Sequence, residues 1–485
     1  MKKEKIETQE DYIQSLKELD HQVYYRGDRV ADVTEHPAII PHINAAAMTY
    51  ELARDPMHRE LMTAASHLTG HEINRFTHIH QSIDDLLKKV RMLRLLSHKT
   101  GSCYQRCVGL DGLNALYSVT FEMDQKHGTG YHKKFRDFLQ EVQDRNVMVV
   151  GAMTDVKGDR SLAPSAQDDP DLYVHVVDRR DDGIVIRGAK AHQTGAVNSH
   201  EILVLPTITL RERDKDFAVA VAVPADAPGV IMIFGRQTND DRKMQGEIDI
   251  GNARFSLVGG EALVVFEDVF VPWERVFMCG ECDFSGLLVE RFATYHRQNY
   301  GACKGGLADV LIGACALAVE QIGVAGASHV RDKIAEMIHL TETVYACSVA
   351  CSAQGYRTPS GAYYADPLLA NACKHNITRV IYELGRLGHD LAGGVIATLP
   401  SEQDLHSRTV GRYVEKYFKG VKDVPTEERI RILRLIENMT GGTALAESMH
   451  GAGSPQAQRI MYLRLGNLEQ KKKLARRLAG IKDVE

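Results

Sequence analysis

Hydrophobic patterning changes twice along the chain, and these two changes constrain its fold more than any other feature. Up to about residue 146, apolar residues recur every three to four positions with few β-branched clusters, which predicts helices. From Val147 to about Pro272, short β-rich runs alternate with polar or Gly/Pro turns at roughly ten-residue intervals, which is typical of an antiparallel barrel or sandwich. Helical patterning resumes near Phe284. We therefore expect an α+β multidomain protein with a helical domain (1–146), a β domain (147–283) and a second helical domain (284–485).

Length and charge agree with this division and exclude several classes of function. The 485 residues suffice for two or three domains with substantial cores. The net charge of −5, with both signs mixed along the chain, predicts neither a nucleic-acid stripe nor a polybasic membrane patch. The charged N-terminus lacks the apolar core of a signal peptide, and no later stretch reaches about 18 uninterrupted apolar residues. We expect a cytoplasmic protein without a membrane or nucleic-acid partner.

Two cysteine-containing segments are candidates for metal binding. The odd number of cysteines, nine, in a long cytosolic chain argues against a disulfide framework and favours metal binding or burial. Cys103 and Cys107 in TGSCYQRCVGLDG are four residues apart, which on a helix places both on one face. His296 and Cys303 in YHRQNYGACKGG are seven residues apart, which is two helical turns. The two pairs could supply four ligands at the interface between the helical domains.

Spacing alone leaves burial open as the alternative, because free cysteine is among the most buried residue types. Cys347 and Cys351 have the same spacing in an apolar, alanine-rich segment, and we interpret them as core residues. Cys279 and Cys282 form a C-x-x-C, a spacing used by zinc and redox sites, but no matching second pair follows. The first set differs because polar residues crowd around it: Arg106, Arg297, Gln298, Asn299, Tyr300 and Lys304.

Common cofactor and metalloenzyme motifs are missing from the sequence. No G-x-G-x-x-G follows a predicted strand and no Walker A sequence occurs, so a flavin would need another binding device. A zinc hydrolase is excluded at His71 and Glu72, because Arg75 stands where the second histidine should be.

Long stretches of the chain resemble one enzyme family, the 4-hydroxybutyryl-CoA dehydratases, which often also carry vinylacetyl-CoA isomerase activity. The resemblance covers nearly the whole chain, and its specific stretches are AMTYELARDP, KTGSCYQRCVGLD, GAMTDVKGDRSLAPSAQ, RGAKAHQTGAVNSHE, ERFATYHRQNYGACKGG and ESMHGAGSPQAQRIM. It implies a homotetramer with an acyl-CoA dehydrogenase-like fold: an N-terminal helical domain, a middle β-barrel and a C-terminal helical bundle.

The resemblance also implies the reaction and its cofactors. The enzyme would dehydrate 4-hydroxybutyryl-CoA to crotonyl-CoA by a radical mechanism with FAD and a [4Fe–4S] cluster, the ligands being Cys103, Cys107, His296 and Cys303. His296, once displaced or loosely held, would also be a base, Tyr300 would protonate the leaving hydroxyl and Lys304 would supply positive charge. Glu261 and Glu447 match the family's active-site carboxylates, with base and orienting roles both open.

Flavin contacts are implied for three segments of the chain. The residues are Met153, Thr154, Asp155, Lys157, Gly158, Arg160, His192, Gln193, Thr194 and Gly195, together with Gly393 and Gly394, where a neighbouring subunit would touch the flavin. Independently of the family, Lys157 and Arg160 can meet a pyrophosphate, and Gly158 and Gly195 allow close backbone approach. The same TDVKGDR segment is equally compatible with a solvated hairpin turn.

Two rival functions remain at this stage. The more distant flavin-dependent 4-hydroxyphenylacetate monooxygenases share the architecture but would not be expected to carry Cys103, Cys107, His296 and Cys303 as cluster ligands, so these four residues decide between the branches. An iron–sulfur redox sensor or electron-transfer protein is the second rival, and the polar residues around the ligands argue against it.

Overall fold

A computed structural model describes residues 5–237, 241–242, 245–252, 254–255 and 259–481. Its N-terminal part contains six helices among the described residues: α1 (Gln9–Lys17), α2 (Ile40–Arg54), α3 (Arg59–Met62), α4 (Ile83–Thr100), α5 (Cys107–His127) and α6 (Tyr131–Arg145). This part is not wholly helical, contrary to the prediction from patterning. It also contains the strands β1 (Gln22–Tyr25), β2 (Asp28–Arg29), β3 (Thr63–Ala65) and β4 (Glu72–Asn74). In β1, β-branched and aromatic residues alternate between buried and half-buried positions, as in a sheet that is covered on one face.

Strands dominate the middle of the chain, as predicted. They are β5 (Val149–Ala152), β6 (His175–Arg179), β7 (Gly183–Thr194), β8 (Glu201–Val204), β9 (Val219–Pro224), β10 (Val230–Phe234), β11 (Glu261–Pro272) and β12 (Val276–Cys279), with the short helix α7 (Glu247–Ile250) between β10 and β11.

The prediction of a middle β-barrel is wrong, because the described strands do not form a closed barrel. The described strands form a six-stranded sheet in the order β2-β1-β10-β11-β7-β6 and a four-stranded sheet in the order β12-β9-β8-β5, and no ladder joins the two sheets into a ring. One edge of the larger sheet stays open because the N-terminal strand β1 pairs in parallel with β10. Strand β2 then pairs with β1 and forms the edge of the sheet. Ten-residue spacing of strands cannot distinguish two sheets from one closed sheet.

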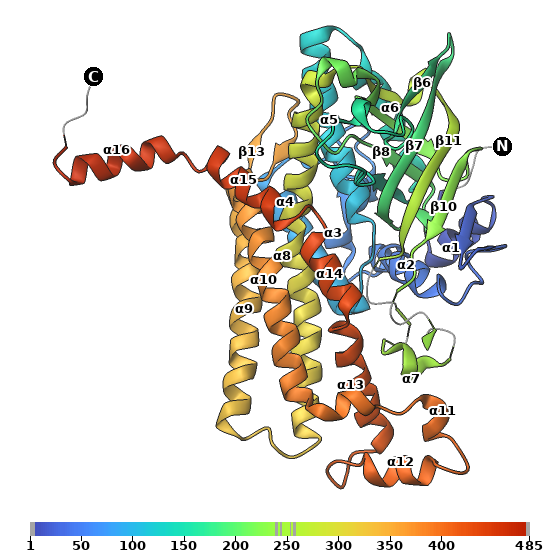
Figure 1. The fold of residues 1–485 in the computed structure, drawn as a ribbon, viewed down its shortest axis with the longest axis vertical. Coiled ribbons are helices and arrows are strands. Elements are labelled where there is room, and N and C mark those ends of the chain that lie inside the picture. Colours follow the sequence, from blue (N-terminus) through green and yellow to red (C-terminus); the bar gives the residue numbers. More distant parts are fainter. Residues whose placement is uncertain (1–4, 238–240, 243–244, 253, 256–258, 482–485) are drawn as a thin grey trace.

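The C-terminal part is helical. Its described helices are α8 (Cys282–Glu320), α9 (Ser328–Ala353), α10 (Pro367–Ala392), α11 (Glu402–Leu405), α12 (Gly411–Tyr417), α13 (Thr426–Met439), α14 (Gly442–His450), α15 (Pro455–Leu465) and α16 (Leu468–Leu478), with one hairpin of β13 (Tyr356–Arg357) and β14 (Tyr363–Tyr364). In Figure 1, α8, α9 and α10 run side by side as a long bundle, and α16 projects away from the body.

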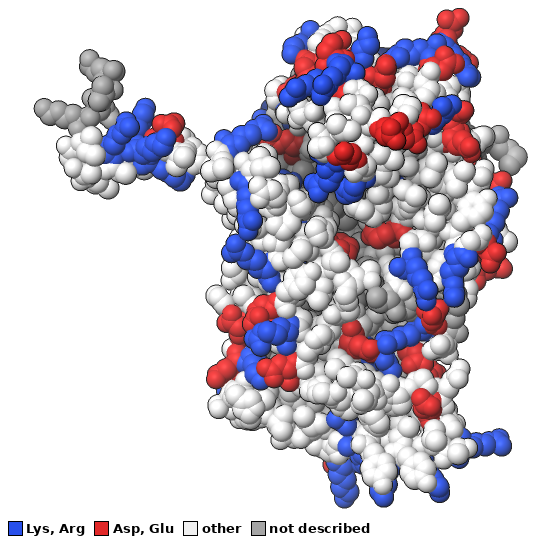
Figure 2. Space-filling model, in the orientation of Figure 1, with Lys and Arg blue, Asp and Glu red and all other residues white. Residues whose placement is uncertain are grey.

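Helix α8 is the central element of the protein. It packs against α4 and α5 on one side and against α9, α10 and α13 on the other, so it joins the two helical regions. Among the described helices, only α8 is long and apolar enough to cross a membrane by length and composition, and 56% of its most apolar window is buried inside the protein. The core helix of a globular protein can be equally long and apolar, so this property alone is weak evidence for a membrane span. The face in Figure 2 mixes basic and acidic side chains.

Candidate active site

Four of the predicted catalytic and ligand residues lie together on α8. His296, Tyr300, Cys303 and Lys304 are spaced by one and two turns and share a face of the helix, which confirms their predicted helical placement. The rings of His296 and Tyr300 are 5.6 Å apart between centroids. Gly301 lets this part of α8 approach α9 closely, because a Cβ there would lie 2.2 Å from the carbonyl oxygen of Val344.

Cys103 and Cys107 are not on one helix, which corrects the prediction from their spacing. Helix α4 ends at Gly101, which is left-handed with φ +55°, and Cys103 lies in the loop that follows. Gln105 in this loop also has a positive φ of 67°, and Cys107 is the first residue of α5. The loop therefore positions Cys103, and Gln105 anchors it by donating a 2.9 Å hydrogen bond from Nε2 to the carbonyl of His42.

Cys103, Cys107 and Cys303 lie near one another; Cys107 is buried and the other two are partly buried. Burial raises the pKa of the Cys107 thiol, and the neighbouring Cys103, Asp111 and Cys303 raise that pKa further. Burial likewise raises the pKa of Cys303, to about 11. Cys103 also lies near the sheet: a Cβ added to Gly259 would be 3.5 Å from its Sγ and 2.4 Å from Cγ2 of Thr194. Ligation by a metal would have to deprotonate these thiols.

No group of three or more His, Cys, Asp and Glu side chains among the described residues is spaced to hold a metal ion. This result bears on a single ion, whose ligands all meet one centre. An iron–sulfur cluster takes its ligands on different irons and therefore needs a wider arrangement. The three neighbouring thiols, with the imidazole of His296 on the same helix as Cys303, could hold such a cluster.

His296 is held by residues that the sequence-based prediction missed. Its Nδ1 lies 2.8 Å from Oδ2 of Asp111 on α5, and the ammonium of Lys89 on α4 lies 2.6 Å from Oδ1 of Asp111. The exposed fraction of both Lys89 and Asp111 side chains is 0%. The available signal was the position of Asp111 one turn after Cys107, which turns it to the same side of α5.

Glu447 on α14 reaches the same face of α8 from the far end of the chain. It accepts a 3.1 Å hydrogen bond from the Tyr300 hydroxyl and forms an ion pair with Lys304. A further residue absent from the prediction, Lys374 on α10, places its ammonium 4.2 Å from the centroid of the Tyr300 ring. Lys374 also donates hydrogen bonds to the carbonyls of Ser448 and Met449, so it fixes the end of α14 beside Tyr300.

The two predicted active-site carboxyl groups have opposite protonation tendencies. Burial, reinforced by the charge of Glu447, raises the pKa of Glu261 to about 8. For Glu447, burial alone would raise the pKa, but the charge and hydrogen bond of Lys304 lower it overall. Paired carboxyl groups whose environments separate their pKa values are a common acid–base arrangement in enzymes. Glu261 lies at the start of β11, where its two carboxyl oxygens lie 2.9 and 2.8 Å from the Thr194 hydroxyl and share its single hydrogen.

Two of the three predicted flavin segments lie against each other. The backbone N–H of Met153 donates to Oε1 of Gln193 at 3.1 Å, and Nε2 of Gln193 donates to the carbonyl of Thr154 at 2.9 Å. Burial and the nearby charge of Lys157 lower the pKa of His192, which places His192 near the exposed end of the 153–160 loop. Asp155 forms an ion pair with the buried Lys190, so its side chain has a structural partner.

This pair of segments borders the cysteine loop. Gly195 has φ +74°, and a Cβ there would come within 2.9 Å of Gln105. Gly158, also with a positive φ of 51°, and Arg160 are exposed. The flavin segments and the three thiols are therefore neighbours in one chain.

The third segment, Gly393–Gly394, is not brought to this place within one chain. It follows α10, where Gly388 packs against Leu311 and Cys315 of α8, roughly two to three helical turns beyond Cys303. Both glycines are exposed, and no described atom lies within 4 Å of a Cβ added to either. Within one chain these two glycines therefore lie apart from the other two predicted flavin segments.

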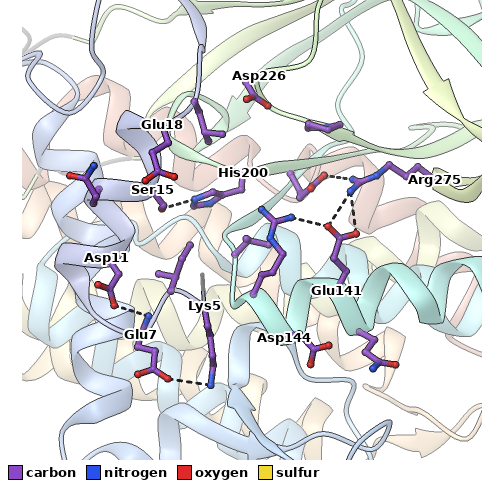
Figure 3. Close-up of a pocket in the computed structure, with 18 of the residues that line it drawn as sticks. Lys5, Glu7, Asp11, Ser15, Glu18, Glu141, Asp144, His200, Asp226 and Arg275 are labelled. Carbon is purple, nitrogen blue, oxygen red and sulfur yellow. Dashed lines mark hydrogen bonds and ion pairs between the residues drawn. The ribbon is translucent and has the colours of Figure 1, made fainter. Parts of the chain in front are cut away.

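A wide cavity of about 1370 Å³ lies elsewhere, between α1, α6 and the loop of Arg275. Figure 3 shows acidic side chains such as Glu18, Glu141 and Asp144 around it, with His200 hydrogen-bonded to Ser15. None of the predicted catalytic, ligand or flavin residues lines this cavity.

Comparison with known families covers almost the whole chain. Residues 8–278 match the family model described as 4-hydroxyphenylacetate 3-hydroxylase N terminal, and residues 285–480 match the corresponding C-terminal model. The 4-hydroxybutyryl-CoA dehydratase/vinylacetyl-CoA-Delta-isomerase of Clostridium aminobutyricum is 55% identical, over 98% of this chain and 99% of that protein. The 4-hydroxyphenylacetate 3-monooxygenase oxygenase component of Thermus thermophilus is 25% identical, over 89% of this chain and 87% of that protein.

Solved structures give the same ranking. An oxygen-tolerant archaeal 4-hydroxybutyryl-CoA dehydratase from N. maritimus superposes with a TM-score of 0.97 at 52% identity, covering 99% of this chain and 96% of that chain. The oxygenase component of 4-hydroxyphenylacetate 3-monooxygenase, complexed with FAD, superposes with a TM-score of 0.86 at 24% identity, covering 98% of both chains, which shows a common fold. The chain therefore belongs to the 4-hydroxyphenylacetate 3-hydroxylase family and, within it, to the group of 4-hydroxybutyryl-CoA dehydratases.

Proposed function

We propose that this protein is a lyase and isomerase that dehydrates 4-hydroxybutyryl-CoA to crotonyl-CoA and isomerises vinylacetyl-CoA, using FAD and a [4Fe–4S] cluster. The supporting observation is the convergence of three cysteine thiols and His296 beside the Tyr300–Glu447–Lys304 network, in a chain 55% identical to a protein of that name. The solved relative that contains FAD has the same fold, which supports FAD as the flavin.

The residues present fit both cofactors. Cys103, Cys107 and Cys303 would supply thiolates and His296 an imidazole, a donor set of the kind that iron–sulfur clusters use. The loop 153–160 and the segment 192–195 would hold FAD, with Lys157 and Arg160 free to meet its pyrophosphate.

The reaction needs chemistry that side chains do not supply. The C2 hydrogen is weakly acidic beside the thioester, but no carbonyl activates the C3 hydrogen, and a side-chain base supplies only about 10²–10⁴-fold. One-electron chemistry on the thioester enolate, which makes the C3 hydrogen acidic, would come from FAD. Lewis-acid polarisation of the 4-hydroxyl group would come from the cluster.

The protein's own groups would move the protons. Tyr300 is a proton donor rather than a base, because burial and the charge of Glu447 raise the pKa of its hydroxyl. Glu447 and Lys304 hold that hydroxyl in place, and Tyr300 would protonate the leaving 4-hydroxyl group. His296 would accept a substrate proton at Nε2 only when this nitrogen is displaced from its role as a ligand, because Nδ1 is held by Asp111. Glu261, neutral below a pKa of about 8, would orient the substrate or serve as a second acid.

We also propose a cytoplasmic homotetramer with three domains, at 1–146, 147–283 and 284–485, and an architecture similar to the acyl-CoA dehydrogenases. Self-association is supported by α16, which projects from the body and exposes Leu468 and Leu478 together with Leu463 of α15 (Figure 1). Exposure of Gly393 and Gly394 supports a shared flavin site. Light scattering of the purified protein should give the mass of four chains, and a monomer that retains full activity would contradict this arrangement.

Anaerobic purification tests the whole proposal. Iron, sulfide and FAD should be present at about four, four and one per chain, as a [4Fe–4S] flavoprotein requires. The same preparation should convert 4-hydroxybutyryl-CoA to crotonyl-CoA without an added reductant, because the dehydration involves no net redox change. An iron-free yellow protein that consumes oxygen with a phenolic substrate would instead identify a monooxygenase.

A further inference from the structure

The ion pair between Lys89 and Asp111 is unusual because water reaches neither side chain. The ammonium of Lys89 on α4 lies 2.6 Å from Oδ1 of Asp111 on α5, and the exposed fraction of both side chains is 0%. Replacing a buried ion pair by well-packed apolar residues is often neutral or stabilising. Stability therefore gives no sufficient reason for this pair at this position.

Lys89 has a complete set of partners around α8. Besides Asp111, it donates to the carbonyl of Tyr295 at 3.1 Å and to Oε1 of Gln298 at 3.3 Å. Three acceptors match the three N–H groups of an ammonium. Lys89 is thus fixed beside the turn of α8 that contains His296.

Asp111 has donors on both carboxylate oxygens. Oδ1 accepts from Lys89, and Oδ2 accepts from Nδ2 of Asn299 at 2.6 Å and lies 2.8 Å from Nδ1 of His296. An ionised carboxylate accepts hydrogen bonds and cannot donate them. Nδ1 of His296 must then carry the hydrogen of this contact, and in a neutral imidazole the lone pair is left on Nε2.

We propose that Asp111, held by Lys89, is a positioning residue that fixes both the ring orientation of His296 and its Nδ1–H tautomer, so that Nε2 offers a lone pair to the active site. The carboxylate–histidine arrangement is the one that orients metal-binding imidazoles and makes them stronger ligands. The inference rests on the proposed function in one respect: the group that Nε2 would bind is the proposed [4Fe–4S] cluster.

Asp111→Asn tests the proposal, because the amide keeps the shape but can turn an N–H towards Nδ1 and so favour the opposite tautomer. The affinity for iron, measured by anaerobic competition with a chelator, should fall by about 10–100-fold, the usual effect of removing such a partner. In the reduced cluster, the imidazole nitrogen coupling in pulsed EPR spectra should change. Iron affinity within twofold of wild type, with an unchanged nitrogen coupling, would overturn the proposal.

Asp85→Asn is the matched control. Asp85 also lies on a helix of the N-terminal region and forms a mostly buried ion pair, with Arg75 at 3.2 Å. This variant should lose stability without any change in the nitrogen coupling. If Asp85→Asn alters the iron site as much as Asp111→Asn does, general destabilisation explains both effects and the positioning role is wrong.

A measurement on the wild-type chain separates this inference from the proposed function and does not depend on the Asp111 variant. Nitrogen-15 NMR of iron-free, histidine-labelled protein, with the His296 signal assigned by its loss in His296→Gln, reports which ring nitrogen carries hydrogen. A protonated Nδ1 supports the inference even if wild-type protein never binds iron, which would defeat only the cofactor proposal. A protonated Nε2 with a bare Nδ1 would overturn the inference whatever the iron content.

Discussion

The hydroxyl of Tyr300 on α8 donates a 3.1 Å hydrogen bond to Oε1 of Glu447 on α14. The contact joins residues 147 positions apart in the chain and brings the C-terminal helices to the face of α8 that carries His296 and Cys303. Lys304 pairs with the same carboxylate. Tyr300, the acid of the proposed reaction, is therefore held in place by contacts between α8 and α14. The sequence pattern could not predict that these two helices lie together.

Tyr300→Phe removes this proton donor and little else. Turnover of 4-hydroxybutyryl-CoA should fall by about 10²–10⁴-fold, the usual contribution of a positioned acid, with iron and flavin contents unchanged. Tyr364→Phe is the control, since Tyr364 is also buried and donates a 2.7 Å hydrogen bond to Thr294 away from the thiols. Wild-type turnover in the Tyr300 variant would show that another group protonates the leaving hydroxyl.

Gly451→Ala should disturb the same contact from the opposite side. A Cβ at Gly451 would lie 1.7 Å from the Tyr300 hydroxyl, so the chain after α14 must shift or the ring must move. A displacement of about 1 Å at a catalytic group can cost about 10²-fold in rate, and we expect kcat to fall by that amount. Gly442→Ala, whose Cβ would have no atom of the described residues within 4 Å, should leave kcat unchanged. Equal kinetics for the two variants would contradict the tight contact.

Cys103→Ala should abolish bound iron and dehydration together, because the remaining donors would leave one iron without its thiolate. The measurement is iron and sulfide content beside turnover in anaerobically purified protein. Cys315→Ala is the matched control, since Cys315 is a fully buried free cysteine in the core between α8 and α10. Dehydration by an iron-free Cys103 variant would refute the role of the cluster.

Two half-buried histidines, His67 and His132, predict a loss of stability in acid. His67 and His132 flank Tyr117, with ring centroids 5.0 and 4.8 Å from it, and burial lowers the pKa of each to about 4. Between pH 6.5 and 4 the unfolded chain binds protons at these sites and the folded chain does not, so stability falls as the pH is lowered through this window and the loss is complete below pH 4.

The measurement for this effect is the melting temperature as a function of pH. His67→Phe removes one titrating ring whose two nitrogens lack hydrogen-bond partners among the described residues. Both proteins should melt at a lower temperature at pH 4 than at pH 6.5. The decrease should be about 1–3 °C smaller for His67→Phe than for wild type, a figure that allows for partial solvent screening. Substituting the exposed His329 by Gln should not change the slope. Parallel curves for His67→Phe and wild type would exclude this histidine as a cause.

Local patterning determined the change from a mainly helical region to a β region and back, and the shared face of His296, Tyr300, Cys303 and Lys304, because both depend only on consecutive residues. It missed the short strands β1 to β4. It failed at Cys103, where the left-handed Gly101 ends α4 and turns a helical spacing into a loop. The whole-chain resemblance identified Glu261 and Glu447, whose positions follow no local rule.

Only the tertiary structure decided how distant residues meet. Strand β1 joins β10 in the larger sheet, so the described strands of the β region form two sheets. Asp111 and its partner Lys89 lie beside His296, and Lys374 lies beside Tyr300. The physical reason is that such contacts depend on the packing of α4, α5, α10 and α14 around α8, and periodicity along one element carries no information about which element lies beside it. The sequence by itself determined the chemistry available to the site, and tertiary packing determined which groups hold His296 and Tyr300 in place.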